Sequence, residues 1–340
     1  MTSTHYLVTG AAGFIGSHFV RGLLGPEGTG GAGGAGAVEV TALDALTYAG
    51  DPANLAPAES DRRFRFVRGD IGDAPLVRAL MRPGTVVVNF AAESHVDRSI
   101  ADAGAFVRTN VLGTQTLLDA ALHSDVRCFL QISTDEVYGS VEHGTWTEEA
   151  PIAPNSPYAA SKASADLLAL SYARTHGLDV RITRCSNNYG SHQHPEKLIP
   201  RFVTTLLDGG AVPLYGDGGN VRDWLHVSDH CRALRTVLEH GAPGEVYNVG
   251  GGTQLTNREL TGLILDACGA DWSSVRLVED RKGHDRRYCV DDRKLRGLGQ
   301  LPLVPFEQGL ADTIDWYREH RGRWAENGAT GAAASLPARG

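Results

Sequence analysis

The sequence lacks the features that would place the protein on a nucleic acid or in a membrane. Its 340 residues include 32 Lys and Arg against 40 Asp and Glu, a formal net charge of −8. Nucleic-acid-binding domains usually carry the opposite balance, so we expect no nucleic-acid partner. No apolar stretch approaches the roughly 20 residues that span a bilayer, and the N-terminus MTSTHYLVTG has no basic region followed by an apolar core. We therefore expect no membrane partner and a cytoplasmic protein.

Organised cysteines are also missing. The five cysteines show neither C-x-x-C spacing nor paired clustering: Cys128, Cys185, Cys231, Cys268 and Cys289. An odd number without such spacing argues against a zinc site or a disulfide framework and favours reduced thiols. His192 and His194 lie close together in GSHQHPEK, but no cluster of acids or thiols accompanies them. We expect both to be polar loop residues and predict no metal site.

What is present is an alternation of strand and helix patterns. Short β-rich runs, from YLVTG to VRITRCS, alternate with segments of helical period such as residues 107–122 and 158–175. This alternation is typical of a parallel sheet covered by helices on both faces. The pattern loosens after about residue 186 and resumes with GEVYNVG at 244–250. We predict an α/β protein, with a Rossmann-like doubly wound parallel sheet and a smaller, mixed C-terminal substrate-binding domain.

These patterns also predict domain boundaries. We expect a nucleotide-binding domain over residues 1–186, completed by about 223–250, and a second domain from 187–222 and 251–324. The Gly/Ala-rich stretch 25–37 has little to bury and is typical of a flexible surface loop. The small, polar tail 325–340 is typical of a disordered segment.

Glycines follow the first predicted strand in VTGAAGFIGS. Gly10, Gly13 and Gly16 would let the backbone approach a pyrophosphate, whose charge meets the amides at the start of the following helix. A tight packing turn would need similar glycines. The next strand, VEVTALD, ends in Asp44, 28 residues past Gly16 rather than the usual ~20, and the Gly/Ala stretch accounts for the excess. A carboxylate there can bind ribose hydroxyls and repels a 2′-phosphate, so we predict NAD rather than NADP.

Other residues end predicted strands on the same edge of the sheet. Asp70 follows the third strand, and Ala91 and Ala92 follow the fourth. Ligands bind at the carboxyl ends of strands in such folds, so these positions are candidate cofactor contacts. For Asp70, a turn or helix cap is an equally good interpretation.

Candidate reacting groups lie in two further segments. Ser156 can cap and Pro157 can begin a helix that carries Tyr158 and Lys162 four residues apart, on one face. An ammonium beside a phenol favours the phenolate, which would lower the tyrosine pKa and make it a base for a sugar hydroxyl. A helix surface that carries Tyr and Lys by chance is the alternative. QISTDEVYGS places Thr134, Asp135 and Glu136 where an apolar run stops, and two buried acids there require an explanation.

Nine ordered motifs give the chain a resemblance to a known family. They are TGAAGFIGS, LDALTYAG, FAAESHVDRSI, STDEVYG, SPYAASKA, CSNNYG, EKLIP, GDGGNVRDWLHV and RKGHDRRY. The chain resembles the extended short-chain dehydrogenase/reductases and, within them, the dTDP-glucose 4,6-dehydratases. The resemblance covers nearly the whole length, apart from the Gly/Ala stretch and the tail.

The resemblance implies a catalytic scheme. Tyr158, assisted by Thr134 and Lys162, would take the proton of the sugar 4-hydroxyl while carbon 4 is oxidised by NAD. Glu136 would then remove the proton on carbon 5, and a protonated Asp135 would help the 6-hydroxyl leave as water. Hydride would return to carbon 6, giving dTDP-4-keto-6-deoxyglucose. Neighbouring carboxyls can hold opposite protonation states because close acids push their pKa values apart.

The resemblance also implies binding residues. Cofactor contacts would come from Gly10, Gly13, Phe14, Ile15, Gly16, Asp44, Leu46, Thr47, Asp70, Ile71, Ala91, Ala92, Thr109, Tyr158, Lys162 and Asn188. Substrate contacts would come from Ser94, Asn187, Glu196, Lys197, Leu198, Pro213, Tyr215, Arg222, Asn257, Arg281, His284 and Tyr288. Lys197, Arg222 and Arg281 could form the local cationic patch that a diphosphate requires in a chain of negative net charge. For each arginine alone, a solvated ion pair is the alternative, and His284 could equally be structural.

Three other points follow. The surplus apolar residues of segments 107–122 and 158–175 favour a homodimer, which is usual in this family. A nucleotide-sugar 4-epimerase, or a dehydratase acting on a UDP-, GDP- or CDP-hexose, is an alternative enzyme; epimerases typically have Ser or Ala in place of the acid pair. A nucleotide-sensing regulator without turnover is the non-enzymatic alternative.

Overall fold

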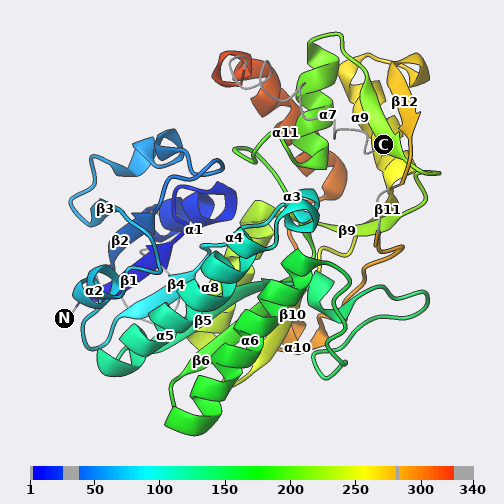
Figure 1. The fold of residues 1–340 in the computed structure, drawn as a ribbon. Coiled ribbons are helices and arrows are strands. Elements are labelled where there is room, and N and C mark those ends of the chain that lie inside the picture. The colour runs from blue at the N-terminus through cyan, green and yellow to red at the C-terminus, as the bar shows by residue number, and fades with distance from the viewer. Residues whose placement is uncertain (1–2, 26–37, 281–282, 325–340) are drawn as a thin grey trace.

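The computed structural model describes residues 3–25, 38–280 and 283–324. The predicted Gly/Ala loop (from residue 26) and the predicted tail lie outside the described residues, as does Arg281. A seven-stranded parallel sheet runs through the larger part of the molecule (Figure 1). Its strands, in spatial order, are β10 (Val246–Val249), β6 (Val180–Cys185), β5 (Cys128–Thr134), β4 (Val86–Asn89), β1 (Thr4–Thr9), β2 (Val38–Asp44) and β3 (Phe64–Arg68). The predicted doubly wound α/β fold is confirmed.

Helices cover both faces of this sheet, as the apolar runs of its central strands require. One face packs under α1 (Phe14–Leu24), α8 (Val227–His240) and α10 (Arg293–Arg296). The other packs under α2 (Ala74–Ala79), α5 (Thr114–His123) and α6 (Pro157–His176). Because the strands run in parallel, their carboxyl ends share one edge. The strand order reverses direction between β1 and β4, and this switch point opens a crevice.

Helix α6 shows how local sequence sets these elements. Ser156 is its N-cap, with Oγ accepting a hydrogen bond from the Ala159 amide at 3.1 Å, and Pro157 is its first residue. The helix ends where Gly177 adopts a left-handed conformation. The observed cap and first residue of the helix are the predicted ones. The local sequence therefore places Tyr158 and Lys162 in the first two turns of α6.

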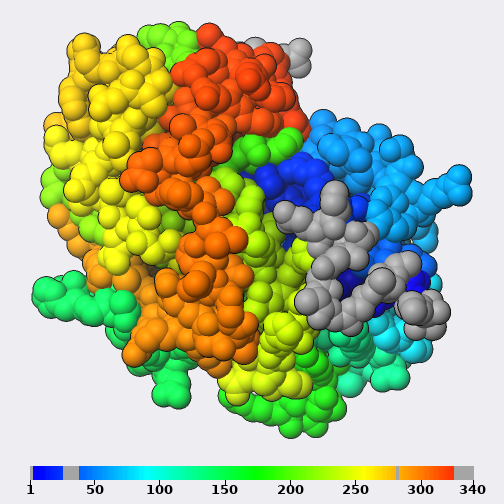
Figure 2. All heavy atoms as spheres, turned by 180° about the vertical axis from the view of Figure 1, so that it is seen from behind, coloured from blue at the N-terminus to red at the C-terminus, as the bar shows by residue number. Residues whose placement is uncertain are grey.

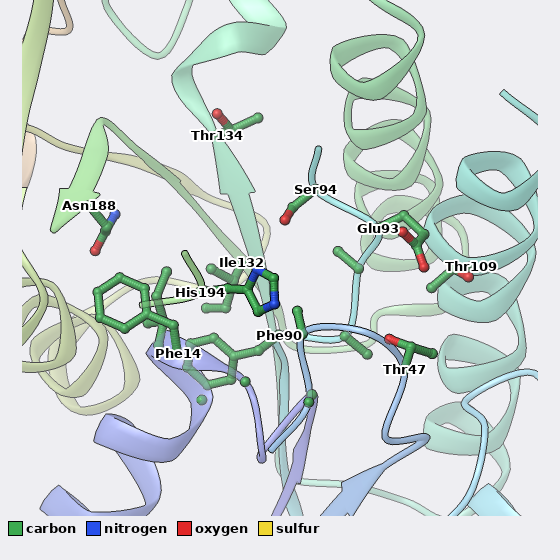
Figure 3. A pocket seen from close by; sticks show the side chains of 18 of the residues that line it. Phe14, Thr47, Phe90, Glu93, Ser94, Thr109, Ile132, Thr134, Asn188 and His194 are labelled. Atoms are coloured by element: carbon green, nitrogen blue, oxygen red, sulfur yellow. The ribbon is translucent and has the colours of Figure 1, made fainter. Parts of the chain in front are cut away.

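Short helical segments connect the fourth strand to α5 and follow β2 and β5. They are α3 (Val96–Ala101), α4 (Gly104–Phe106), the π-helix η4 (Val107–Gly113), and the 3₁₀ turns η2 (Pro52–Asn54), η3 (Ala56–Ala58) and η5 (Asp135–Tyr138). The π-helix runs directly into α5, so the predicted helical segment 107–122 is interrupted rather than uniform. Thr109, on this π-helix, faces the crevice (Figure 3).

The C-terminal segments form a smaller body above the carboxyl edge of the large sheet (Figure 1). It contains a three-stranded sheet of β11 (Gln254–Thr256), β9 (Val221–His226) and β7 (Asn187–Tyr189), and a parallel pair of β8 (Val212–Tyr215) and β12 (Val275–Val278). Its helices are α7 (Leu198–Leu207), α9 (Asn257–Cys268), α11 (Phe306–Glu319) and the 3₁₀ turns η6 (Trp272–Ser274) and η7 (Arg321–Arg323). These helices and strands share their own apolar core.

The last described residues contact the segment that follows β2. Arg323 donates hydrogen bonds to Asp51 and, at 2.7 Å, to the side chain of Asn54. Figure 2 shows from behind the red C-terminal residues beside the light-blue residues of this segment. Within the described ranges, no helix is long and apolar enough to cross a membrane.

Candidate active site

A cavity of about 320 Å³ lies at the carboxyl edge of the large sheet, where the strand order reverses. It is lined by the glycine turn after β1, the ends of β2, β4, β5 and β6, and the segment that leads into α7. Figure 3 shows Thr134 at the end of β5, with Ser94, Thr109 and Thr47 on one side and Asn188 and Phe14 on the other. Candidate residues from the large sheet, from β7 and from the segment before α7 therefore meet in one cavity.

The glycine turn has no room for side chains. Gly10 has φ +63°, and a Cβ there would lie 2.6 Å from the Ala91 amide nitrogen. A Cβ on Gly16 would lie 2.3 Å from the Gly10 carbonyl oxygen. Helix α1 thus starts directly against the end of β1, and its first residues, Phe14 and Ile15, line the cavity. This arrangement fits an anionic group placed at the start of a helix.

Asp44 braces the same turn. Its Oδ2 accepts a hydrogen bond from the Ala12 amide at 2.8 Å, and its Oδ1 accepts one from the Leu46 amide at 2.8 Å. Burial raises the pKa of Asp44, and these amide hydrogen bonds oppose the rise. The carboxylate lines the cavity, whereas Leu46, with φ 55°, packs against the core and does not line it. Asp44 therefore has a structural role beside the predicted one.

Both interpretations of Asp70 agree with the structure. Its Oδ1 accepts a hydrogen bond from the Gly72 amide at 2.7 Å, which makes it a turn residue, and it also lines the cavity. The other predicted cofactor positions that line the cavity are Gly13, Thr47, Ile71, Ala91, Ala92, Thr109 and Asn188.

The two adjacent acids lie in unequal surroundings. Thr134 caps the turn η5, and its hydroxyl donates to Asp135 Oδ1 at 3.3 Å and accepts from the Glu136 amide at 3.3 Å. Asp135 is 3% exposed, and burial, followed by the charges of Glu136 and Asp223, raises its pKa well above the usual range. Glu136 is only partly buried. The surroundings favour a neutral Asp135 beside a more accessible Glu136.

Tyr158 and Lys162 both reach the cavity from α6. Lys162 donates from Nζ to the Ile132 carbonyl oxygen at 2.6 Å, and burial lowers its pKa. The prediction that Tyr158 has a lowered pKa is wrong for the protein alone. Burial raises the pKa of Tyr158 well above its ordinary value, and the Glu136 charge adds to the rise, while the Thr134 hydroxyl opposes it. Desolvation of a phenolate here outweighs its stabilising neighbours.

Four of the predicted substrate residues line the cavity from the C-terminal side or from the loop opposite. Ser94, Asn187, Glu196 and Lys197 all face it, and Lys197 donates from Nζ to the Ser94 carbonyl oxygen at 2.8 Å. Glu196 lies 3.6 Å from Arg98 and 3.9 Å from His95. These contacts link the segment before α7 to the loop after β4 at the opening of the cavity.

The other predicted substrate residues that the structure describes do not line this cavity. They are Leu198, Pro213, Tyr215, Arg222, Asn257, His284 and Tyr288. Several of them contact one another: the Arg222 guanidinium lies 4.3 Å from the Tyr288 ring centre, and the rings of Tyr215 and His284 meet edge to face at 6.4 Å. Arg222 lowers the pKa of Asp135, and Glu136 raises that of Tyr288. Arg222 and Tyr288 therefore lie within electrostatic range of the acid pair.

Sequence reasoning missed several lining residues. They are Leu43, Ala45, Ala49, Gly50, Gly69, Phe90, Glu93, Ile132, Ser133, Cys185, Ser186, Gln193 and His194. His194 was expected to be only a polar loop residue, but it lines the cavity (Figure 3). Its ring meets the Tyr48 ring edge to face, with 5.6 Å between the ring centres. Phe90, Ser133 and Cys185 lie at strand ends next to predicted residues, so their place on the sheet edge was the available signal. Among the described residues, no group of His, Cys, Asp and Glu could hold a metal ion.

Comparisons with known proteins agree with this geometry. Residues 7–313 match the family described as GDP-mannose 4,6 dehydratase. The chain is 62% identical over 337 residues to a dTDP-glucose 4,6-dehydratase of Streptomyces griseus, covering 99% of this chain and 100% of the relative. The crystal structure of DesIV, a dTDP-glucose 4,6-dehydratase of Streptomyces venezuelae with NAD and TYD bound, is 61% identical with a TM-score of 0.91, covering 95% and 99%. A UDP-glucose 4-epimerase of Thermotoga maritima shares the fold at 31% identity, with a TM-score of 0.84 over 94% and 100%.

Proposed function

The chain belongs to the family described as GDP-mannose 4,6 dehydratase and, within it, to the dTDP-glucose 4,6-dehydratases, and from this we propose that it dehydrates dTDP-glucose to dTDP-4-keto-6-deoxyglucose with NAD as cofactor. The protein is thus a hydro-lyase. The observation that carries the proposal is the pair Asp135 and Glu136, placed beside Tyr158 at the end of β5 in the same cavity as the glycine turn. An oxidising scaffold alone would need no such pair.

The cavity fits the proposed cofactor. The turn at Gly10 and Gly16 excludes side chains, and the start of α1 provides amides for a pyrophosphate. Asp44 is the proposed acid for the adenosine ribose, Tyr158 and Lys162 are proposed to meet the reacting end, and Thr109 and Asn188 are further proposed contacts from the cavity lining. When bound, NAD brings a positively charged ring to this site and accepts a hydride from carbon 4, which it returns at carbon 6.

Tyr158 acts first in the proposed sequence. It takes the proton of the 4-hydroxyl, so that carbon 4 can become a carbonyl. The Thr134 hydroxyl favours its phenolate and opposes the effect of burial, and the Lys162 ammonium is proposed to act in the same direction. A positioned general base of this kind contributes about 10²–10⁴-fold to a rate.

The acid pair acts next. The new carbonyl makes the proton on carbon 5 acidic, and Glu136, as the more accessible carboxylate, removes it. Asp135, kept neutral by its surroundings, donates a proton to the 6-hydroxyl, which leaves as water. After hydride has reached carbon 6, a proton returns to carbon 5. The sum is loss of one water from the sugar, with the cofactor restored.

The C-terminal segments are the proposed site of the nucleotide part of the substrate, and the large sheet with its helices is the proposed cofactor domain. Among the residues that the structure describes, Lys197 and Arg222 are proposed to bind the diphosphate. Ser94, Asn187 and Glu196 border the cavity, and Leu198, Pro213, Tyr215, Asn257, His284 and Tyr288 extend the proposed site beyond it. Arg281 is part of the same proposal, although it lies outside the described residues.

We further propose a homodimer that works in the cytoplasm. Val107 and Leu112 on η4 and Leu167 on α6 are exposed by 47%, 55% and 54%, and these two elements lie against one another. Exposed apolar groups that gather in one place are typical of an interface. All five cysteines are free thiols, which agrees with a reducing compartment.

A product assay tests the main proposal against the epimerase alternative, because a UDP-glucose 4-epimerase shares the fold. The purified protein, supplied with NAD, should convert dTDP-glucose to a 4-keto-6-deoxy sugar, detected by its absorbance in alkali. Formation of the galactose epimer without a keto sugar would contradict the dehydratase proposal. A panel of dTDP-, UDP-, GDP- and CDP-glucose, compared by kcat/KM, should favour the dTDP sugar.

A further inference from the structure

A buried ion pair lies one helical turn beyond Lys162, and the steps proposed above do not use it. Asp166 on α6 is 0% exposed, and its Oδ2 accepts a hydrogen bond from Nε of Arg184 on β6 at 2.9 Å. Arg184 is 2% exposed. Removing two charges from water costs free energy, so that a buried pair often stabilises a fold no better than apolar side chains of the same volume. Stability alone is therefore a weak reason for this pair.

Lys162 needs a nearby negative charge. It is 4% exposed, and its Nζ donates to the neutral Ile132 carbonyl oxygen, which satisfies a hydrogen bond but not the charge. Asp166 lies four residues further along α6, on the same helix face. Burial lowers the pKa of Lys162, while the charge of Asp166 and, to a smaller extent, the Cys185 thiol act in the opposite direction.

Asp166 is surrounded by groups from three elements. Arg184 on β6, Lys162 on α6 and Ser133 on β5 all favour its ionised form, while burial favours the neutral form. Arg184 is fixed from its other side, because its Nη1 donates to the Tyr138 hydroxyl at 2.9 Å and Tyr138 donates to Asn248 Oδ1 at 2.8 Å. The second oxygen of Asp166, Oδ1, makes no hydrogen bond within the described part of the chain. The guanidinium thus holds the carboxylate by one oxygen.

We propose that Asp166 is a positioning residue that keeps Lys162 protonated in the buried site, and that Arg184 keeps Asp166 ionised for this purpose. The inference rests on the proposed function, since the ammonium form of Lys162 is the form that assists Tyr158. No proton leaves Lys162 in this scheme; the pair only sets its charge. A buried lysine without a nearby carboxylate would lose its proton at a lower pH.

The scarcity of lysine allows a direct test. The chain has four lysines, Lys162, Lys197, Lys282 and Lys294, so NMR of protein labelled with ¹³C at lysine Cε resolves few signals, and Lys162→Arg assigns the one of interest. We compare the wild type with Asp166→Asn/Arg184→Met, which removes both charges and leaves neither unpaired. The Lys162 signal of the double variant should titrate about one to three pH units lower than in the wild type, the usual effect of a close opposite charge.

Activity provides a second readout that a purely structural role would not move. The alkaline limb of the pH profile of kcat/KM should shift to lower pH by the same amount as the NMR titration. Asp179→Asn is the matched control, because it removes the carboxylate of another Asp–Arg pair. Asp179 precedes β6 and pairs with Arg181, which lies on the same strand as Arg184 and also donates to the Val237 and Leu238 carbonyl oxygens. This control should keep the wild-type titration and profile.

The outcomes separate the two proposals. An unchanged Lys162 titration in a folded double variant would overturn the role of Asp166. Absence of dehydratase activity in the wild type would overturn the proposed function and leave the NMR result standing. If the double variant does not fold, Asp166→Asn alone can be used for the same measurement. The Lys162 titration should then shift further to lower pH, because the unpaired Arg184 repels the ammonium.

Discussion

At the scale of single residues, two adjacent carboxyl groups have different surroundings because consecutive residues of a turn point in different directions. Asp135 is directed into the protein, where its Oδ2 has no hydrogen-bond partner among the described residues. Glu136 is partly exposed. A proton added to Asp135 removes a buried charge and its repulsion from Glu136 at once. The pair therefore provides an acid and a base from one short segment.

Replacement of each acid should block a different part of the second step. Glu136→Gln should leave oxidation at carbon 4 possible but abolish exchange of the carbon 5 proton, lowering turnover about 10²–10⁴-fold. Asp135→Asn is the matched control and should retain that exchange while losing water elimination. Mass spectrometry of the sugar after incubation in D₂O measures the exchange. Rapid deuterium incorporation in Glu136→Gln would contradict the assigned base.

Tyr158→Phe should lose the first oxidation itself. The phenolate oxygen that accepts the 4-hydroxyl proton is absent in this variant, while the ring still fills its buried site. We expect single-turnover experiments to show little reduced cofactor by absorbance, with substrate binding retained. Reduced cofactor formed at a near-normal rate would refute the assignment.

At the scale of elements, the junction of β1 and α1 requires glycine at position 16, whereas Gly22, further along α1, is not required. Gly16→Ala would place a Cβ 2.3 Å from the Gly10 carbonyl oxygen, so we expect a loss of stability of about 1–3 kcal/mol and weaker NAD binding. Gly22→Ala, on the same helix, meets nothing within 4 Å and should be neutral or stabilising by about 0.5–1 kcal/mol. Denaturant unfolding and NAD titration measure both variants. Equal effects of the two substitutions would contradict the close-packing explanation.

The sheet and its ends were predictable from sequence because each rests on local signals. A few neighbouring residues are enough to show the strand runs, the glycine spacing, the cap Ser156 and the first-turn Pro157. The π-helix η4 does not, since residues 107–113 keep an ordinary helical pattern. His194 reaches the cavity only through long-range packing, and the ionisation of Tyr158 depends on burial that spacing does not reveal.

At the scale of the whole molecule, the exposed apolar residues of η4 and α6 predict an association surface. Figure 1 shows α6 along the front of the molecule beside α5. Leu167→Glu should convert the proposed homodimer to a monomer in sedimentation velocity experiments, because a charge in an apolar interface is costly to desolvate. Leu303→Glu is the control, as Leu303 is also exposed, by 68%, but precedes α11 in the other part of the molecule. A dimer that persists in Leu167→Glu would place the interface elsewhere.

The stability of the whole molecule should fall in mild acid because of His230. This side chain is 0% exposed and its Nδ1 contacts Asn188 Oδ1 at 2.9 Å; burial lowers the pKa of His230 from 6.5 to about 3. Between these two pKa values the unfolded chain binds a proton that the folded protein does not, so this contribution is complete above the unfolded value and declines as pH falls toward the folded one. From pH 6.5 to pH 5 we expect it to decrease by about 2 kcal/mol. His230→Asn keeps a donor near Asn188 but cannot titrate. Urea unfolding across this range should therefore show that the free energy of unfolding depends less on pH in this variant than in the wild type. An equal pH dependence in the two proteins would exclude His230 as the cause.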